Sequence, residues 1–207
     1  MRTLMILVLA VGCGGNGTPP PNQPPPPPND PRTLRGPEAF ESIADPRARS
    51  QALFLEASKV FLHPRCANCH PPDDTPRQRM GEIHDPPVAR GVDDHGVPAM
   101  RCTGCHQDRN QDHTRVPGAP AWGLAPIEMA WLDRTPAQIS AQIKDPARNG
   151  GRTLAKIQEH VAHDALVGWG WAPGADREPA PGTQAIAGAL VQAWIDTGAE
   201  CPPEAVR

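Results

Sequence analysis

Apolar side chains recur at the spacing of an α-helix in four segments of the chain. In the first, Leu53, Ala57 and Phe61 lie four positions apart, so they share one face of a helix. Asp45 is a suitable N-cap for this helix, and Pro64 cannot continue it. The sequence therefore predicts four helices, at about residues 46–62, 136–145, 152–163 and 184–196.

Two of these helices carry additional local signals. Thr135, Pro136 and Gln138 combine an N-cap, a helix-starting proline and the glutamine of a capping box. Gly188 stands inside the last helix, where glycine costs about 1 kcal/mol relative to alanine. Because such a glycine is useful where another helix approaches closely, the sequence predicts a close helix crossing at this position.

The segment from His63 to Pro126 has little hydrophobic periodicity and is rich in proline, glycine and aspartate. It predicts long irregular loops and no strand, because no stretch alternates convincingly between apolar and polar residues. The whole chain has three phenylalanines and no tyrosine to fill a core, beside five tryptophans. The expected fold is therefore mainly α, with helices and long irregular loops packed around a bulky cofactor.

Two pentapeptides, at residues 66–70 and 102–106, have the pattern C-x-x-C-H. In this pattern two thiols three positions apart each bond a haem vinyl group, and the imidazole of the next residue binds the iron. The pattern predicts two covalently bound haem c groups. The predicted thioether residues are Cys66, Cys69, Cys102 and Cys105, and the predicted proximal iron ligands are His70 and His106.

The paired cysteines have three alternatives to haem attachment: a four-thiolate zinc site, two redox dithiols, or disulfides. None of these explains a histidine directly after both pairs, so haem attachment is the favoured interpretation. Cys201 is left over, either as a free thiol or as a partner of Cys13 if Cys13 is not lipidated.

The sequence defines the sixth iron ligands much less well. His84 ranks first, because a proline-rich loop between the motifs could aim it at an iron. His160 and His163 lie on one face of the third predicted helix, so one of them could reach an iron. Met129 is the leading methionine, at a distance from the motifs that resembles the methionine loop of small cytochromes c. The remaining candidates are His63, His95, His113, Met80 and Met100.

The N-terminus has the features of an export signal, with Arg2 followed by an apolar run at residues 4–11. This run is shorter than the roughly 20 residues of a membrane-spanning helix. The residues up to Cys13 resemble a lipoprotein cleavage box, although Ala10 stands where leucine is usual; a conventional signal peptide is the alternative. We expect a signal peptide at residues 1–12, a lipid-anchored proline-rich linker at 13–37 and a dihaem domain at 38–207.

These features predict a protein of the cell envelope or periplasm, attached to a membrane through a lipid on Cys13. The proline-rich linker should be extended at about 3 Å per residue, which would keep the domain tens of ångströms from the anchor. A net charge of −3 without a block of Lys and Arg gives no sign of nucleic-acid binding.

Beyond the haem motifs, several segments resemble bacterial dihaem cytochromes of the isoquinoline 1-oxidoreductase subunit group, within the cytochrome c superfamily. These segments are residues 63–65, 100–101, 117–120, 124–126, 129–131, 144–146 and 167–171. The resemblance implies an electron carrier whose redox partner is a molybdenum-containing hydroxylase of N-heterocyclic aromatic compounds. It also implies cytochrome c-like helices, of which the first leads into a haem motif and crosses the last. Nothing in the chain resembles a molybdopterin or flavin site.

The principal alternative is a dihaem peroxidase, in which one haem keeps an open position for hydrogen peroxide. Such enzymes usually have longer chains and widely separated motifs, whereas the cysteine pairs here are 36 positions apart. We therefore expect an electron-transfer protein that performs no bond chemistry itself.

Overall fold

The computed structural model describes residues 30–174 and 176–204. The predicted signal peptide (residues 1–12), the lipidation site Cys13 and the first part of the linker lie outside the described residues. The described part is mainly α-helical, as predicted. The elements are η1 (Pro37–Phe40), α1 (Pro46–Phe61), α2 (Pro64–Ala67), β1 (Arg77–Gln78), β2 (Glu82–Ile83), β3 (Gly96–Val97), β4 (Met100–Arg101), α3 (Cys102–Cys105), η2 (Ile127–Met129), α4 (Pro136–Lys144), α5 (Leu154–His163), α6 (Ala165–Gly168), η3 (Trp169–Trp171) and α7 (Gln184–Asp196). None of the helices in this part of the chain has the length and apolar character needed to cross a membrane.

The four predicted helices are confirmed as α1, α4, α5 and α7. The side chain of Asp45 caps α1 by accepting a hydrogen bond from an amide of the first turn. Thr135 and Gln138 form the predicted capping box at the start of α4. Thr153 and Thr183 cap α5 and α7 through their side chains alone, which accept hydrogen bonds from the amides of Lys156 and Ile186. The local signals of the sequence therefore determine where these helices begin.

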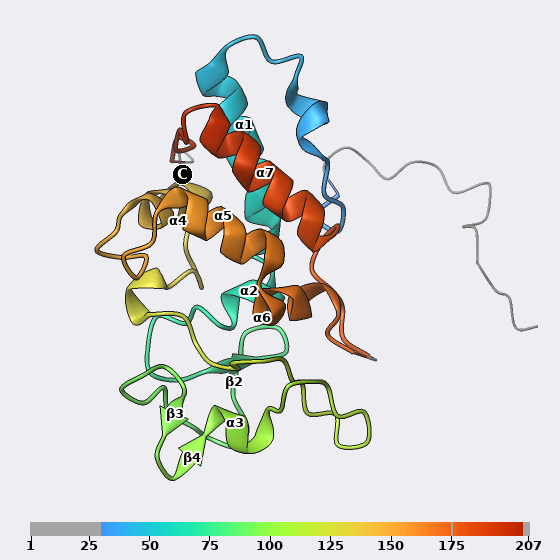
Figure 1. Ribbon diagram of the computed structural model, residues 1–207, viewed down its shortest axis with the longest axis vertical. Helices are drawn as coiled ribbons and strands as arrows, with labels where there is room; N and C mark the ends of the chain where they lie inside the picture. Colours follow the sequence, from blue (N-terminus) through green and yellow to red (C-terminus); the bar gives the residue numbers. More distant parts are fainter. Residues whose placement is uncertain (1–29, 175, 205–207) are drawn as a thin grey trace, which may run out of the picture.

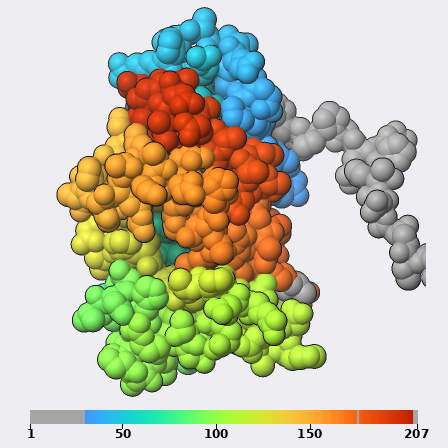
Figure 2. Space-filling model, in the orientation of Figure 1, coloured from blue at the N-terminus to red at the C-terminus, as the bar shows by residue number. Residues whose placement is uncertain are grey.

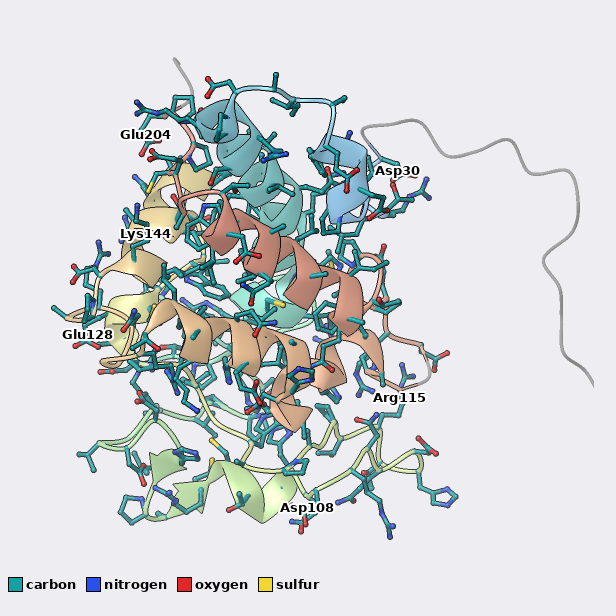
Figure 3. All side chains as sticks on the ribbon, turned by 45° about the horizontal axis from the view of Figure 1, so that its top comes forward. Asp30, Asp108, Arg115, Glu128, Lys144 and Glu204 are labelled. Atoms are coloured by element: carbon teal, nitrogen blue, oxygen red, sulfur yellow. The ribbon has the colours of Figure 1, made fainter. Side chains whose placement is uncertain are left out.

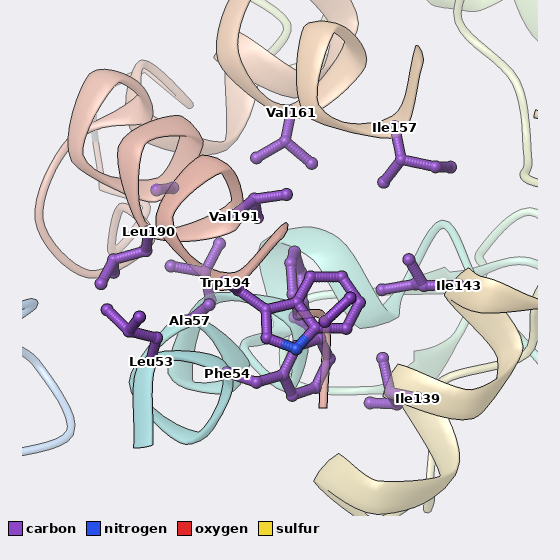
Figure 4. Close-up of a cluster of buried hydrophobic side chains, with 14 of the residues drawn as sticks. Leu53, Phe54, Ala57, Ile139, Ile143, Ile157, Val161, Leu190, Val191 and Trp194 are labelled. Atoms are coloured by element: carbon purple, nitrogen blue, oxygen red, sulfur yellow. The ribbon is translucent and has the colours of Figure 1, made fainter. Parts of the chain in front are cut away.

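The hydrophobic core lies where α7 packs against both α1 and α5, with α4 beside α1 (Figure 1). Figure 4 shows Trp194 near the centre of this core, next to Phe54. Trp194 is fully buried, and its ring centroid lies 4.8 Å from that of Phe54. Burying a side chain such as Phe54 contributes about 1.5–3 kcal/mol relative to leaving it exposed. These helices thus supply a side-chain core of their own.

The close helix crossing predicted at Gly188 is confirmed, and its partner is α5. A Cβ atom on Gly188 would lie 2.5 Å from the Cβ atom of Ala162, so no larger residue fits without a shift. α7 also packs against α1, so the first and last long helices are in contact. The glycine, however, serves the crossing of α7 with α5 and not the crossing that the resemblance implied.

Residues 30–37, which the sequence assigns to the end of the linker, pack against the helices. Leu34 is 9% exposed and joins the hydrophobic core. Arg35 forms a 2.6 Å ion pair with the buried Glu56 of α1, which also pairs with Lys59 at 2.8 Å. Figure 3 shows Asp30 beside η1 and α1. The sequence pattern missed this contact because a single leucine among prolines has no periodicity.

Residues 71–126, which we call the loop part, lie at the end of the molecule away from most of α1 and α7 (Figures 1 and 2). The rest of the described chain is the helical part. The loop part contains two antiparallel hairpins, β1 with β2 and β3 with β4. Their paired residues are Arg77 with Ile83, Gln78 with Glu82, Gly96 with Arg101 and Val97 with Met100. Strands of two residues are too short for the alternation that sequence analysis looks for.

A buried arginine ties the loop part together. Arg90 is 4% exposed. Its guanidinium donates hydrogen bonds to the backbone carbonyls of Pro71, Asp73 and Ala125. These acceptors come from both ends of the loop part, so the Arg90 guanidinium connects segments that are far apart in the sequence.

Candidate haem-binding sites

The first C-x-x-C-H motif follows α1 almost directly. Nδ1 of His63 accepts a hydrogen bond from the amide of Arg65 and thereby caps the short helix α2. α2 carries Cys66, and the turn continues to His70, whose amide donates to the Ala67 carbonyl at 3.0 Å. Because the two cysteines are three positions apart on this turn, their side chains lie on the same face.

Both thiols of the first motif lie in a desolvated environment. Burial raises the pKa of Cys66 to about 12 and that of Cys69 to about 11. A redox dithiol needs a thiol of lowered pKa, so this environment disfavours the dithiol alternative. After burial, the nearby Cys102 is the next cause of the raised pKa of Cys69. The two motifs therefore approach each other at these two residues.

The ring of His70 is held from two sides. Its Nδ1 atom lies 2.7 Å from the carbonyl oxygen of Met129, and because a carbonyl only accepts, Nδ1 is the donor. The Trp131 ring stacks on it with the centroids 3.5 Å apart. Burial lowers the pKa of His70 to about 3. The neutral ring therefore has its free electron pair on Nε2, which is the form in which histidine binds a metal.

His106, at the end of the second motif, is held in the same way. Its Nδ1 atom donates to the carbonyl of Pro117 at 2.8 Å. Its ring stacks on Trp122 with the centroids 4.5 Å apart and the planes 4° from parallel. Burial lowers the pKa of His106 below its usual value, and the nearby His84 also contributes. The two motif histidines thus share one arrangement although their surroundings differ.

Two buried donors near His70 have no hydrogen-bond partner among the described residues. They are Nε1 of Trp131, on the ring that stacks against His70, and Nε of Arg90, which lies 3.9 Å from the exposed carboxylate of Asp74. Unpaired buried donors require an explanation, such as a bound acceptor. Haem carries two propionate carboxylates, which accept hydrogen bonds from such donors. These residues therefore fit the cofactor that the motifs predict.

Among the predicted sixth ligands, His84 lies beside the second motif. The ring centroids of His84 and His106 are 5.9 Å apart, and the ring planes meet at 67°. His84 directly follows β2, and its amide donates to the Pro76 carbonyl at 3.0 Å. Its Nδ1 atom donates to the carbonyl of Pro86 at 2.9 Å. The proline-rich loop thus fixes the orientation of the His84 ring.

His160 and His163 lie together on α5, where both line an open pocket of about 340 Å³. His160 is near the first motif, because its charge is among the causes that lower the pKa of His70. Nδ1 of His160 lies 3.3 Å from the carboxylate of Asp164. A carboxylate in this position commonly orients a metal-binding histidine. His160 therefore remains the candidate sixth ligand at the first motif, while His163 only lines the pocket.

The position of Met129 argues against a role as the sixth ligand of the first haem. Its carbonyl holds Nδ1 of His70, on the side of the ring away from an iron at Nε2. Its side chain is 5% exposed and packs in the hydrophobic core. Met129 thus supports His70 through its backbone.

The remaining candidates have other contacts or are exposed in the described structure, although the His95 carbonyl accepts a hydrogen bond from the Cys102 amide at 3.0 Å. His63 caps α2, and Nδ1 of His95 donates to the carbonyl of Asp93. His113, Met80 and Met100 are exposed.

The alternatives to haem can be compared with the positions of the cysteines. Within residues 30–174 and 176–204 no cysteines are joined by a disulfide. In the same residues, no three or more His, Cys, Asp or Glu side chains are grouped as a site for one metal ion. A four-thiolate zinc site requires such a group. Cys13, the predicted alternative partner of Cys201, lies outside the described residues.

Comparisons with known proteins found no matching family model, no matching curated protein and no matching solved structure. The geometry of the two motifs is therefore the basis on which a function can be proposed.

Sequence reasoning missed the groups that hold the motif histidines. The acceptors on Met129 and Pro117 are backbone carbonyls, so no side-chain pattern reveals them. Asp164 could have been found, because it lies four positions after His160 at the end of the same predicted helix. Arg90 has no sequence signal, since an isolated arginine in a loop is usually exposed.

Proposed function

We propose that this protein is an exported c-type cytochrome that binds two covalent haems and carries electrons. The observation that carries the proposal is common to both motifs. Each histidine after a cysteine pair has Nδ1 bonded to a backbone carbonyl, at 2.7 Å for His70 and 2.8 Å for His106. Iron-binding histidines usually have their second ring nitrogen fixed in this way, which leaves Nε2 for the metal.

Each haem supplies an iron that accepts and releases one electron at a time. The chain supplies attachment and orientation: the four motif cysteines form the thioethers, and His70 and His106 are the proximal iron ligands. Arg90 and Trp131 offer their unpaired donors to the propionates of the first haem.

The proposed electron donor is a molybdenum-containing hydroxylase of N-heterocyclic aromatic compounds, as the resemblance to isoquinoline 1-oxidoreductase subunits implies. Hydroxylation of such a substrate releases two electrons, and two haems can accept one each. A lipid on Cys13 would keep the carrier at a membrane of the cell envelope, close to a respiratory acceptor.

A dihaem peroxidase remains the second candidate because of one observation. The open pocket of about 340 Å³ beside His160 is lined by acidic and basic side chains, and His160 lies near His70. If His160 does not bind the first iron, peroxide could reach an open position there. The two functions therefore differ in whether one iron is accessible to small ligands.

The test is made on the full chain, exported in a host that attaches haem c. The oxidised and reduced proteins are compared by optical and electron paramagnetic resonance spectra, and both haems are titrated against a series of redox mediators. Carbon monoxide, cyanide and hydrogen peroxide are then added in turn.

Two low-spin haems that are each reduced reversibly by one electron, without peroxide turnover, would support the electron carrier. A high-spin haem that consumes peroxide would support the peroxidase instead. A purified chain without covalent haem would contradict both.

A further inference from the structure

The rings of His84 and His106 form a pair of neighbouring imidazoles in the loop part. His84 comes from the end of the β1–β2 hairpin and His106 from the end of α3. The two rings meet with their centroids 5.9 Å apart. This inference rests on the proposed function, because it concerns the haem that His106 would bind.

The ring spacing is close to the span of one metal ion held between two imidazoles. A bond from an imidazole nitrogen to a metal is about 2 Å long. Two such bonds, with about 1 Å from each nitrogen to its ring centre, give a span of about 6 Å between centroids. The 5.9 Å between the His84 and His106 centroids agrees with this span. Edge-to-face ring contacts also have centroids about 4.5–7 Å apart, so the assignment depends on the orientation of the ring nitrogens as well.

Both rings also have the required nitrogen free. Nδ1 of His84 donates to the Pro86 carbonyl, and Nδ1 of His106 donates to the Pro117 carbonyl. Each ring therefore has its electron pair on Nε2 when neutral. Among the described residues, neither Nε2 atom has a hydrogen-bond partner. Two neighbouring imidazoles that both have Nδ1 occupied and Nε2 without a protein partner are suited to share a cation.

We propose that His84 is the sixth ligand of the haem iron bound by His106, so that this iron has two imidazole ligands and no open position. The second haem is then a site for electron transfer alone. Its reduction potential is lower than it would be with one histidine and one methionine. Any reaction with small ligands is confined to the first haem.

The test compares His84→Ala with His113→Ala in the full haem-loaded chain. His113 is the control, because it also lies in the loop part and its side chain is exposed. We expect His84→Ala to bind one more equivalent of carbon monoxide per chain than the parent protein, with one haem converted to high spin. Added imidazole should restore the low-spin spectrum, whereas His113→Ala should match the parent throughout.

A second variant replaces the proposed ligand by another side chain that can bind iron. In His84→Met, one of the two haems should gain the absorption band of methionine bound to ferric iron, and its potential should rise while the other stays unchanged. If His84→Ala keeps two low-spin haems that ignore carbon monoxide, His84 is not a ligand. That result leaves the proposed function intact, whereas absence of covalent haem from the parent would remove both.

Discussion

The helical part and the loop part each present one C-x-x-C-H motif, but they hold it by different means. In the helical part, the motif follows α1 and lies beside a core with fully buried side chains such as Trp194, Phe54 and Ile139. In the loop part, no leucine, isoleucine, valine, phenylalanine, methionine or tryptophan is buried. Its buried residues are Pro71, Pro76, Arg90, Gly96, Gly118, Ala119 and Gly123.

This difference indicates what each part needs in order to fold. Apolar burial is the main source of folding free energy, and the helical part obtains it from its own side chains. The loop part has little apolar burial to offset the entropy of ordering its residues. We infer that a haem supplies the missing apolar surface there, so the loop part should depend on its cofactor much more strongly than the helical part does.

The largest predicted effect follows from removing the second attachment site. In Cys102→Ser with Cys105→Ser, the haem content should fall from two to one per chain. Proteolytic cleavage within residues 71–126 should become about tenfold faster or more, corresponding to about 1.4 kcal/mol of lost local stability. Limited proteolysis with mass spectrometry measures this, and far-ultraviolet circular dichroism should show the helices retained.

The same experiment on the first motif shows whether the loop part depends on the second haem alone. Cys66→Ser with Cys69→Ser should also lose one haem while protease resistance in the loop part is largely kept. Cys201→Ser, which alters a thiol outside both motifs, should keep two haems. Equal proteolytic sensitivity in both double variants would contradict the asymmetry between the two parts.

The next prediction concerns the global free energy of unfolding and not the haem content, and it follows from opening the core of the helical part. Trp194→Ala should lower the free energy of unfolding by about 3–5 kcal/mol, because it leaves a large cavity beside Phe54. Urea denaturation followed by circular dichroism measures this loss. Trp122→Ala is the matched change in the loop part, where the tryptophan is only half-buried. It should cost less stability and instead disturb the spectrum of the second haem, since Trp122 stacks on His106.

The smallest effect concerns the contact between residues 30–37 and α1. Burial would raise the pKa of Glu56, but hydrogen bonds from Arg35 and Lys59 outweigh burial and hold this pKa below its ordinary value of 4.5. The ionised carboxylate therefore contributes stability above pH 4.5, and this contribution is lost as the pH falls through the lower pKa of the folded chain. Glu56→Gln should lower the free energy of unfolding at pH 7 by about 1–2 kcal/mol.

Unfolding experiments from pH 7 down to pH 3 check this sign. The difference between the parent and Glu56→Gln should shrink as the solution becomes acidic. A difference that grows on acidification would show that the paired carboxylate is not the source of the stability.

The features that the sequence predicts well are those set by neighbouring residues. The four long helices have periodic apolar faces and local caps such as Asp45 and Thr135, so their positions follow from the pattern. The two C-x-x-C-H motifs are also local. In both cases, residues a few positions apart contain the whole signal.

The features that the sequence missed depend on contacts between distant residues. Leu34 and Arg35 join the fold only because α1 presents a core face and the buried Glu56. The role of Met129 depends on its carbonyl, which meets a histidine 59 positions away. His84 stays a predicted ligand, and the sequence could not say that it lies beside His106 of the second motif.

The most direct test of the central claim is the mass of the full chain after export and purification from a host that attaches haem c, combined with a pyridine haemochrome assay. We expect a mass increase of two haem groups that survives denaturation, and two haems per chain in the assay. An exported chain with no covalent haem, and with the cysteines of both motifs still titrating as free thiols, would contradict it.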